Sequence, residues 1–371
     1  MPKRNRTLRR IWIAIGQFFT LMLTALQAIA GSLLLMCAAC VYVSPAHWPL
    51  ASIITLGFPF FLCGSLLTGL LALLFTPRRV WITLLALLLS SGCIRNFVPV
   101  NLPSTPPDSA WHIVSWNVGG TKWDDSARQQ LRDYLGSVQA DLLVAQELTP
   151  ARGDSLQAYL HGQLPYVCFA GNASDYGQVL LSRWPIVGSR LLVQNGGNCA
   201  AVYYVKAPLA DTLFVVNCHL QSMRLSQADR SGYAEIVSGG TTDPDSLEHT
   251  SSTLLARIKE QSAIRALQAD TLARFLAAHA GRPLILAGDL NATPVSYTRQ
   301  TLVEAAPLTD CFRAAGNGLG RSFNRDAIFV RIDHLICSTE HFKPYACRFD
   351  TTRLSDHFPL YCRLAPKQAA P

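Results

Sequence analysis

Acidic, amide and histidine side chains follow most of the apolar runs in the C-terminal two-thirds of the sequence. Asn117 follows HIVSW, Glu147 ends DLLVAQEL and His219 ends LFVVNCHL. Asp289 and Asn291 follow PLILAG, and in an extended chain this two-residue spacing places both side chains on one face. In α/β folds, functional sites are commonly formed by polar residues at the ends of apolar strands.

Three further polar residues belong to this series. Asp333 lies inside RIDHLICS, and Asp356 and His357 adjoin in LSDHFPL. Taken singly, each residue of the whole series could equally be a turn former or a helix cap. Together, two histidines, four acids and two amides provide hard oxygen ligands, a base for water and donors for developing charge. The set therefore indicates metal-assisted phosphoryl chemistry.

Two neighbouring residues favour a structural role. His334 shares a face with Ile332 and Ile336, which predicts a packed core histidine. Cys218 points away from the face of His219, which predicts burial.

Short β-type runs must position these groups. They are HIVSWNV, DLLVAQEL, GQVLLSR, AVYYVKA, LFVVNCHL, PLILAGDL, IDHLICS and PLYCRL. Helical patterns cover residues 126–137 and 254–279, so the sequence predicts a layered α/β domain. The polar stretch 226–252 is expected to be a long mobile loop, either functional or a surface insertion.

The first hundred residues are different, because three long runs carry no formal charge. These runs are 11–43, 44–76 and 80–94, and about 20 apolar residues cross a bilayer as a helix. The first run is too long for the core of a signal peptide. We expect a membrane anchor of three transmembrane helices at 1–98, a Pro-rich linker at 99–109 and a catalytic domain at 110–371.

Basic residues predict how the anchor is oriented. They precede the first run at Lys3, Arg4, Arg6, Arg9 and Arg10 and separate the last two at Arg78 and Arg79, whereas the first connection has none. The positive-inside rule then places the N-terminus in the cytoplasm and the catalytic domain outside it, in a periplasmic or extracellular space. The lipid bilayer is therefore a predicted partner.

The net charge of +8 does not indicate a nucleic-acid-binding surface. Of the 32 basic residues, eight lie in residues 1–100, which contain no Asp or Glu, and the other 24 are matched by 24 acidic residues. Four of the eleven cysteines lie in the apolar segments and seven follow them, with no zinc-type spacing. Disulfides and buried thiols both remain open for these seven.

The ordered series SWNV, QE, GQVLLSRWPI, NCHL, GDLNATP, RIDHLICS and SDHFPL, from about Trp111 to Arg363, resembles the endonuclease/exonuclease/phosphatase superfamily. That superfamily includes DNase I, AP endonucleases, inositol polyphosphate 5-phosphatases and neutral sphingomyelinases. The resemblance implies a DNase I-like four-layer α/β/β/α sandwich, in which two mixed β-sheets are flanked by helices and the site lies at one end.

The resemblance also implies a role for each residue of the series. Glu147 would be the principal ligand of Mg²⁺, for which Mn²⁺ could substitute, with Asn117 beside it and Asp356 sharing the metal or its water. Asp289 would orient and deprotonate the attacking water with help from Asn291. His357, held by Asp333, would donate to the phosphoryl oxygen, and His219 would stabilise the transition state or protonate the leaving group.

His219 in NCHL matches DNase I, sphingomyelinases and 5-phosphatases, whereas AP endonucleases carry a Tyr-Pro-Asn type motif there. This difference argues against an AP endonuclease. The balanced charge after residue 100 and the expected anchor favour a phosphoesterase that acts on a lipid or another small phosphoester. The alternatives are a DNase I-like extracytoplasmic nuclease and an inactive membrane-bound binding module. No protein partner is predictable. Gly316, Gly318, Gly320 and Arg321 could approach substrate or form a plain turn, and Arg257 and Arg265 are expected to be solvated.

Overall fold

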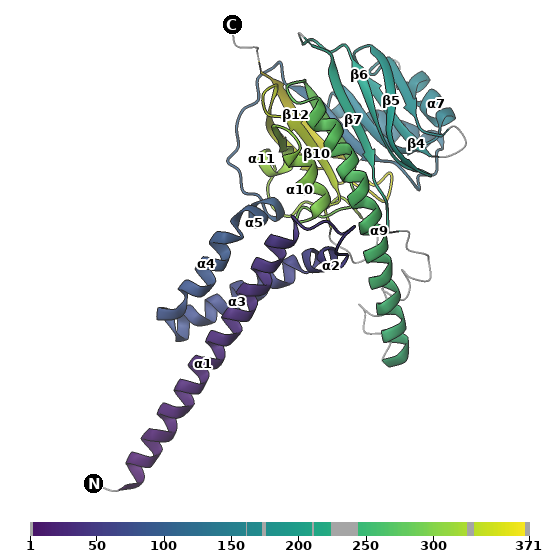
Figure 1. Cartoon of the computed structure of the whole chain (residues 1–371). Helices are drawn as coiled ribbons and strands as arrows, with labels where there is room; N and C mark the ends of the chain where they lie inside the picture. The colour runs from purple at the N-terminus through teal and green to yellow at the C-terminus, as the bar shows by residue number, and fades with distance from the viewer. Residues whose placement is uncertain are drawn as a thin grey trace.

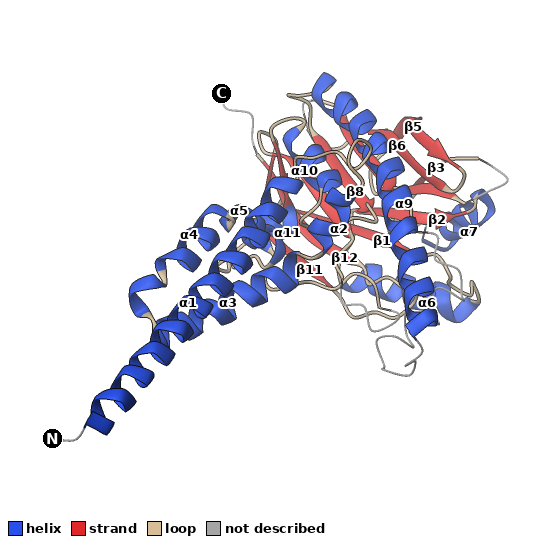
Figure 2. Cartoon of the chain, turned by 60° about the horizontal axis from the view of Figure 1, so that its bottom comes forward, coloured by secondary structure: helices blue, strands red, loops and turns tan. Residues whose placement is uncertain are grey.

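The computed structural model describes residues 3–160, 162–172, 176–209, 211–223, 244–324 and 330–367. Two six-stranded mixed sheets form the body of the protein (Figures 1 and 2). The first has the strand order β11 (Phe342–Phe349), β12 (Leu360–Pro366), β1 (Trp111–Asn117), β2 (Leu142–Leu148), β4 (Gly177–Ser182), β3 (Tyr166–Ala170). The second has the order β5 (Ile186–Asn195), β6 (Asn198–Val205), β7 (Leu213–His219), β8 (Leu284–Asp289), β10 (Asp333–Ser338), β9 (Leu308–Asp310).

The sheets pack face to face because alternate residues of their strands are apolar. Ile113 of β1 and Val215 of β7 lie in the core between the sheets, whereas Val114 and Val216 point outward to the helices. Helices α6 (Asp125–Ser137) and α7 (Pro150–Leu160) cover the first sheet. Helices α9 (Pro244–Ala278) and α10 (Tyr297–Glu304) cover the second. The expected layers of helix, sheet, sheet and helix are confirmed.

All eight predicted strands are present, but four others were missed: β3, β5, β9 and β11. Strand β5 is an edge strand whose residues are mostly exposed, so it lacks the apolar pattern that revealed the others. The predicted helix at 254–279 begins ten residues earlier, at Pro244, so the expectation of a loop is wrong for residues 244–252. Residues 226–243 of that expected loop lie outside the described residues.

The N-terminal region is helical, but not as three unbroken spans. Within α1 (Lys3–Cys40), the segment Arg9–Cys40 is long and apolar enough to cross a membrane, as is α3 (Phe58–Phe75). The third expected span is bent by 64° between Pro77–Leu89 and Ser91–Phe97, which contain α4 (Trp81–Leu89) and α5 (Ser91–Phe97). These two bent helices provide a third candidate span only if they are counted together as one membrane-crossing segment.

The second apolar run was expected to be continuous and is divided. Residues 41–49 form a connection, α2 (Leu50–Leu56) is a short helix, and the chain turns at Gly57 into α3. Hydropathy cannot separate α2 from α3 because both are apolar. In the structure α2 lies between the end of α1 and helix α9 (Figure 1).

The N-terminal helices pack directly on the α/β domain. Val295, in the loop after β8, joins an apolar cluster with Leu34 of α1, Phe58 and Leu62 of α3 and Cys93 of α5. Arg331 donates to the carbonyl oxygen of Asn96. The α/β domain therefore contacts the N-terminal helices through the loop after β8 and the segment before β10.

All eleven cysteines are free thiols in this structure. Among the seven that follow the anchor, Cys311 and Cys337 have sulfur atoms 3.6 Å apart in the core between the sheets. Cys218 is fully buried, as expected.

Candidate active site

The polar ends of the strands from both sheets meet at one end of the sandwich. Asn117 of β1 pairs in register with Gln146 of the parallel strand β2, next to Glu147. In the second sheet His219 of β7 lies beside Asp289 of β8, and Asp289 lies opposite Asp333 of β10. The strand ends of the two sheets also approach each other, since Asn117 contacts Asp289, which is 172 residues away in the chain.

Glu147 reaches the site through an irregularity in β2. The pairing of β2 with β4 shifts register between Gln146 and Leu148, and Glu147 has a positive φ of 61°. Such a conformation is costly for a residue with a side chain and concentrates at functional sites. The Glu147 carboxylate lies against Gly119, where any Cβ would overlap it. A bulge and a glycine thus make room for one carboxylate.

Asp289 is nearly fully buried and is held from two sides. Its Oδ1 accepts from the backbone N–H of Asn291 at 2.8 Å, and its Oδ2 lies 3.3 Å from Asn117 Nδ2. The same Asn117 amide donates to Glu147 Oε1 at 2.8 Å. Asn291 also has a positive φ, of 49°, and its side chain donates to the carbonyl oxygen of Leu220.

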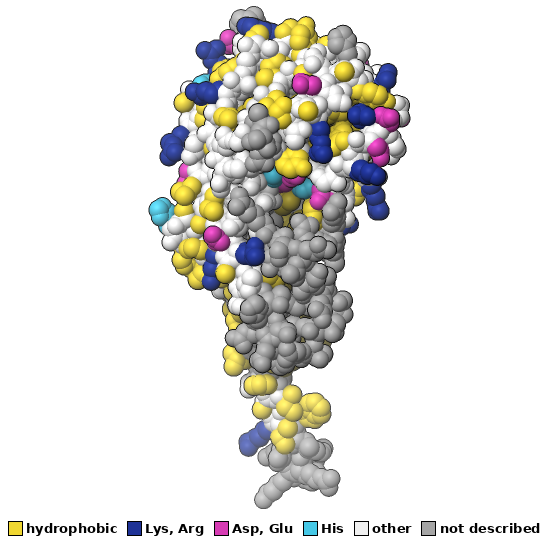
Figure 3. Space-filling view, turned by 90° about the vertical axis from the view of Figure 1, so that its right-hand side faces the viewer, with side chains coloured by type: hydrophobic (Ala, Val, Ile, Leu, Met, Phe, Trp, Pro, Cys, Tyr) yellow, Lys and Arg dark blue, Asp and Glu magenta, His cyan; other side chains and the backbone are white. Residues whose placement is uncertain are grey.

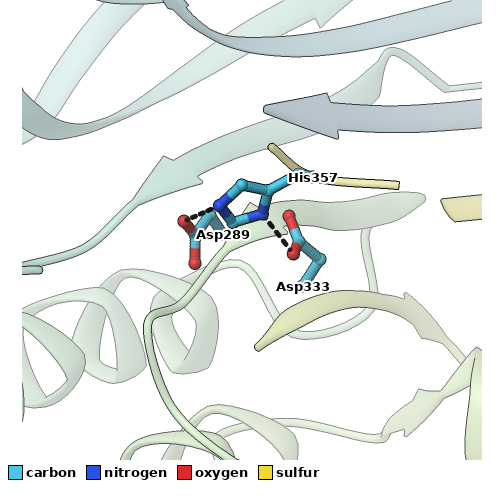
Figure 4. Close-up of side chains that lie close together, drawn as sticks. All are labelled: Asp289, Asp333 and His357. Atoms are coloured by element: carbon cyan, nitrogen blue, oxygen red, sulfur yellow. Dashed lines mark hydrogen bonds and ion pairs between the residues drawn. The ribbon is translucent and has the colours of Figure 1, made fainter. Parts of the chain in front are cut away.

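His357 lies between two buried carboxylates (Figure 4). Its Nδ1 is 2.8 Å from Asp333 Oδ2, and its Nε2 is 3.7 Å from Asp289 Oδ2. Burial opposes the charged imidazolium, but Asp333 and Asp289 outweigh burial and raise the pKa of His357 to about 10. The imidazole is therefore protonated at neutral pH.

Burial raises the pKa of Asp289, and the nearby Asp333 raises it further. Electrostatic interactions with His357 and with His219 lower the pKa of Asp289 in turn. His219 Nε2 lies 3.5 Å from Glu147 Oε1, 4.0 Å from Asp289 Oδ2 and 3.2 Å from Asn198 Nδ2. Asp289 is therefore a carboxylate with increased affinity for a proton, set among positively polarised groups.

These groups face a cavity of about 480 Å³. Six of the eight predicted residues line it: Glu147, His219, Asp289, Asn291, Asp356 and His357. The other two lie behind the lining, Asn117 bonded to Glu147 and Asp333 to His357. Acidic and histidine side chains gather in a hollow on this side of the molecule (Figure 3). The structure thus brings all eight residues together, while their individual roles stay predictions.

Arg265 was expected to be solvated, and this expectation is wrong. The residue is 3% exposed and lines the cavity from α9, where burial lowers its pKa to about 10 and the charge of Asp289 opposes that shift. Its position four residues from Gln261, which is also buried, marks the inner face of α9. That periodicity could have identified it. Arg257 is half-buried.

Two other expectations concern structural residues. His334 is buried, as expected, and its ring contacts Asp310 Oδ2 and the carbonyl oxygen of Ala292. The glycine-rich segment contacts the linker, because Asn101 donates to the carbonyl oxygen of Gly316 at 2.6 Å and Gly318 N–H donates to Pro99. These contacts favour the structural interpretation of the segment.

The donor set at this site fits a hard divalent cation. The Glu147 side chain is 31% exposed, faces the cavity with Asp289 and Asp356, and has Gly119 leaving space beside it. Glu147 and Asp356 could therefore hold Mg²⁺. With its amide nitrogen turned to Glu147, Asn117 orients this ligand. Among the described residues, Asp289, Asp333 and His357 also have possible ligand atoms within 4.8 Å of one another, but the protonated imidazole of His357 already lies between these two acids.

Comparison with known families agrees with this geometry. The model described as Endonuclease/Exonuclease/phosphatase family matches residues 114–357, more than half of the chain. A second model, a domain of unknown function (DUF8431), matches residues 18–97. None of the curated proteins compared with the chain matches it.

Solved structures of low sequence identity are also similar. The catalytic domain of human Nocturnin shares 14% identity and a TM-score of 0.49, covering 72% of this chain and 96% of that chain. An endonuclease/exonuclease/phosphatase family protein of Bacteroides thetaiotaomicron shares 16% identity and a TM-score of 0.46, covering 70% and 98%. A mannosyl-6-phosphatase of the same organism shares 16% identity and a TM-score of 0.43, covering 68% and 99%.

Replacing Asp333 by Asn should lower the pKa of His357 from about 10 toward the ordinary value of about 6.5, because the largest charge that raises it is removed. In the wild type, stabilisation by the imidazolium is complete below about pH 6.5 and is lost as the pH rises through about 10. NMR titration of ¹⁵N-histidine-labelled, metal-free protein measures the shift. Asp211→Asn, at an exposed pair with Arg282, is the matched control. An unchanged His357 pKa in D333N would contradict the assignment.

Proposed function

Since the chain belongs to the Endonuclease/Exonuclease/phosphatase family, we propose that it is a divalent-metal-dependent phosphoesterase that hydrolyses a phosphodiester or phosphomonoester by attack of an activated water. One observation carries the proposal. The carboxylates of Glu147 and Asp289 and the imidazolium of His357 line one cavity, with Asn117 and Asp333 holding them from behind.

Asp289 is the base that orients and deprotonates the water. Its raised pKa matches this role, because a base works best when its proton affinity approaches the operating pH. The Asn291 N–H fixes Oδ1, which leaves Oδ2 beside His357 and Asn117. Asn291 thereby positions the base.

Positive groups stabilise the negative charge that develops on the phosphoryl oxygens. His357 is protonated because Asp333 and Asp289 raise its pKa, and it donates from Nε2 on the cavity side. His219 lies on the opposite side of Asp289 and next to Glu147, where it can donate to the transition state or the leaving group. Preorganised donors of this kind supply much of the rate enhancement in phosphoryl transfer.

Glu147 and Asp356 would hold Mg²⁺, or Mn²⁺ in its place, which when bound supplies charge neutralisation at the phosphoryl group. Asn117 keeps Glu147 oriented. Arg265 supplies a further positive charge from α9, in a position to contact the phosphate.

The proposal includes a membrane anchor at 1–98, a linker at 99–109 and a catalytic domain from 110 onward outside the cytoplasm. Two helices with the length and composition of membrane spans support the anchor. The basic residues before α1 and at Arg78 and Arg79 support the orientation. The balanced charge of residues 101–371 favours a lipid or small phosphoester over nucleic acid.

Glu147→Gln and Asp289→Asn should each lower metal-dependent hydrolysis by about 10²- to 10⁴-fold, since each removes a group that acts in the transition state. The full-length protein in detergent would be assayed on bis-p-nitrophenyl phosphate, p-nitrophenyl phosphate, DNA and phospholipid, with Mg²⁺, Mn²⁺ or chelator. Glu304→Gln and Asp211→Asn are surface controls. Wild-type rates in either active-site variant would refute the proposal. Steeply salt-dependent cleavage of DNA alone would establish the nuclease alternative, and no cleavage at all would favour a binding module.

Arg265→Gln should lower kcat/KM by about 10- to 100-fold on the substrate that the wild type cleaves, because a buried charged donor to the phosphate is lost. Arg274→Gln, on the exposed face of the same helix, should have no effect. Equal rates for the two variants, with unchanged thermal unfolding, would exclude Arg265 from the site.

The orientation is testable with tags at both chain ends. Protease is added to intact spheroplasts, in which the outer surface of the cytoplasmic membrane is accessible. It should remove a C-terminal tag and spare an N-terminal one, because the domain would lie outside and the basic N-terminus inside. Detergent opening, which should expose both tags, is the control. Loss of the N-terminal tag alone would reverse the orientation.

A further inference from the structure

Membrane-anchor residues form part of the wall of the catalytic cavity. Four residues of α2 line it, Ala51, Ser52, Thr55 and Leu56, at the spacing of one helical face. Cys40 and Pro45, which lead into α2, line it as well. The cavity that contains Asp289 and His357 is therefore bounded on one side by the segment between α1 and α3.

This wall is largely apolar and reaches the catalytic histidine. Leu56 and Ala51 of α2 are joined around the cavity by Val330 and Ile332 before β10 and by Phe323. The Phe323 ring lies edge-on to the His357 imidazole with ring centres 5.3 Å apart. One continuous cavity thus has carboxylates and histidines along one part of its lining and hydrocarbon along another.

The position of α2 fixes where this cavity lies. Helix α2 is joined by the 41–49 connection to α1 and through Gly57 to α3, the two helices with the length and composition of membrane spans. With those helices in a bilayer, α2 lies at its surface whichever side the domain occupies. The apolar wall then continues toward the lipid, and a substrate with a hydrocarbon portion can keep it in an apolar environment while its phosphate reaches Asp289.

We propose that α2 is part of the substrate-binding site and that the substrate is an amphiphilic phosphoester of the membrane, whose hydrocarbon portion packs on Ala51, Thr55 and Leu56. This proposal rests on the proposed function. A volume of about 480 Å³ is within the range of ligand sites and accommodates a phosphate head group with the beginning of a chain. The balanced charge of the domain agrees with a substrate that is not a polyanion.

The test is a chain-length series of alkyl p-nitrophenyl phosphate diesters, from methyl to octyl, kept monomeric and assayed with full-length protein in lipid nanodiscs. We expect kcat/KM to rise about fourfold for each methylene that is buried, which corresponds to about 0.8 kcal/mol, until the wall is covered. Leu56→Ser should flatten this rise. Leu50→Ser makes the same change on α2 at a residue that is exposed and does not line the cavity, and it should keep the wild-type slope.

The outcomes separate the two proposals. Hydrolysis of the methyl ester with no dependence on chain length would overturn the role of α2 and leave the phosphoesterase intact. A slope that Leu56→Ser and Leu50→Ser change equally would place the hydrocarbon elsewhere. Failure to hydrolyse any diester or p-nitrophenyl phosphate would remove the proposed function and this proposal with it. Thermal unfolding of both variants, expected to match, shows that the slope reports binding.

Discussion

The arrangement of this site depends on one charge interaction, the imidazolium of His357 between the carboxylates of Asp289 and Asp333. The two acids lie opposite each other on β8 and β10 and are buried, so without a positive charge between them their repulsion would be strong in the protein interior. His357 comes from the first sheet's side of the sandwich, where Trp116 Nε1 donates to its carbonyl oxygen and Ser355 Oγ accepts from its N–H. By neutralising the two acids of the second sheet, His357 holds its own loop, which packs on the first sheet, in place. The two sheets are thereby joined at the end of the sandwich that contains the candidate site.

The same end of the sandwich rests on the apolar helices. Val295, four residues after Asn291, is buried among residues of α1, α3 and α5, and Arg331, two residues before Asp333, donates to the end of α5. The segments that follow Asp289 and precede Asp333 thus carry the contacts to the N-terminal helices. Because closely packed protein interiors have low compressibility, a shift of these helices would be transmitted to the loops that pack on them. The N-terminal helices consequently support the loops beside these two acids, and a fragment that lacks them would leave Val295 and its neighbours exposed.

Sequence patterns predicted the parts of the structure that depend on local chain periodicity. Strand β1 was recognisable because Ile113 and Val114 pack on opposite sides of one sheet, and His334 because it shares the face of Ile336. What was missed depends on partners distant in sequence. The φ of Glu147 follows from its bulge against β4. The burial of Arg265 is different, because its helical spacing from the buried Gln261 is a local pattern that could have predicted it. Helix α2 itself was hidden, because an apolar run gives no sign of a turn at Gly57. The eight polar residues that meet at the site could be identified by motif, but the apolar wall of the cavity could not.

A phosphoester must bring its negative charge to a cavity lined by Glu147, Asp289 and Asp356, with Asp333 directly behind His357. Within the described lining, the imidazolium of His357 and the guanidinium of Arg265 are two positive charges against these four carboxylates. A divalent cation at Glu147 would correct this imbalance, so the electrostatics of the chain give a reason for a metal that is independent of family membership. Charge neutralisation alone, however, would admit any phosphate. The apolar wall of α2 offers binding energy to the remainder of the substrate, and because that wall belongs to the anchor, selection would take place where the hydrocarbon already lies.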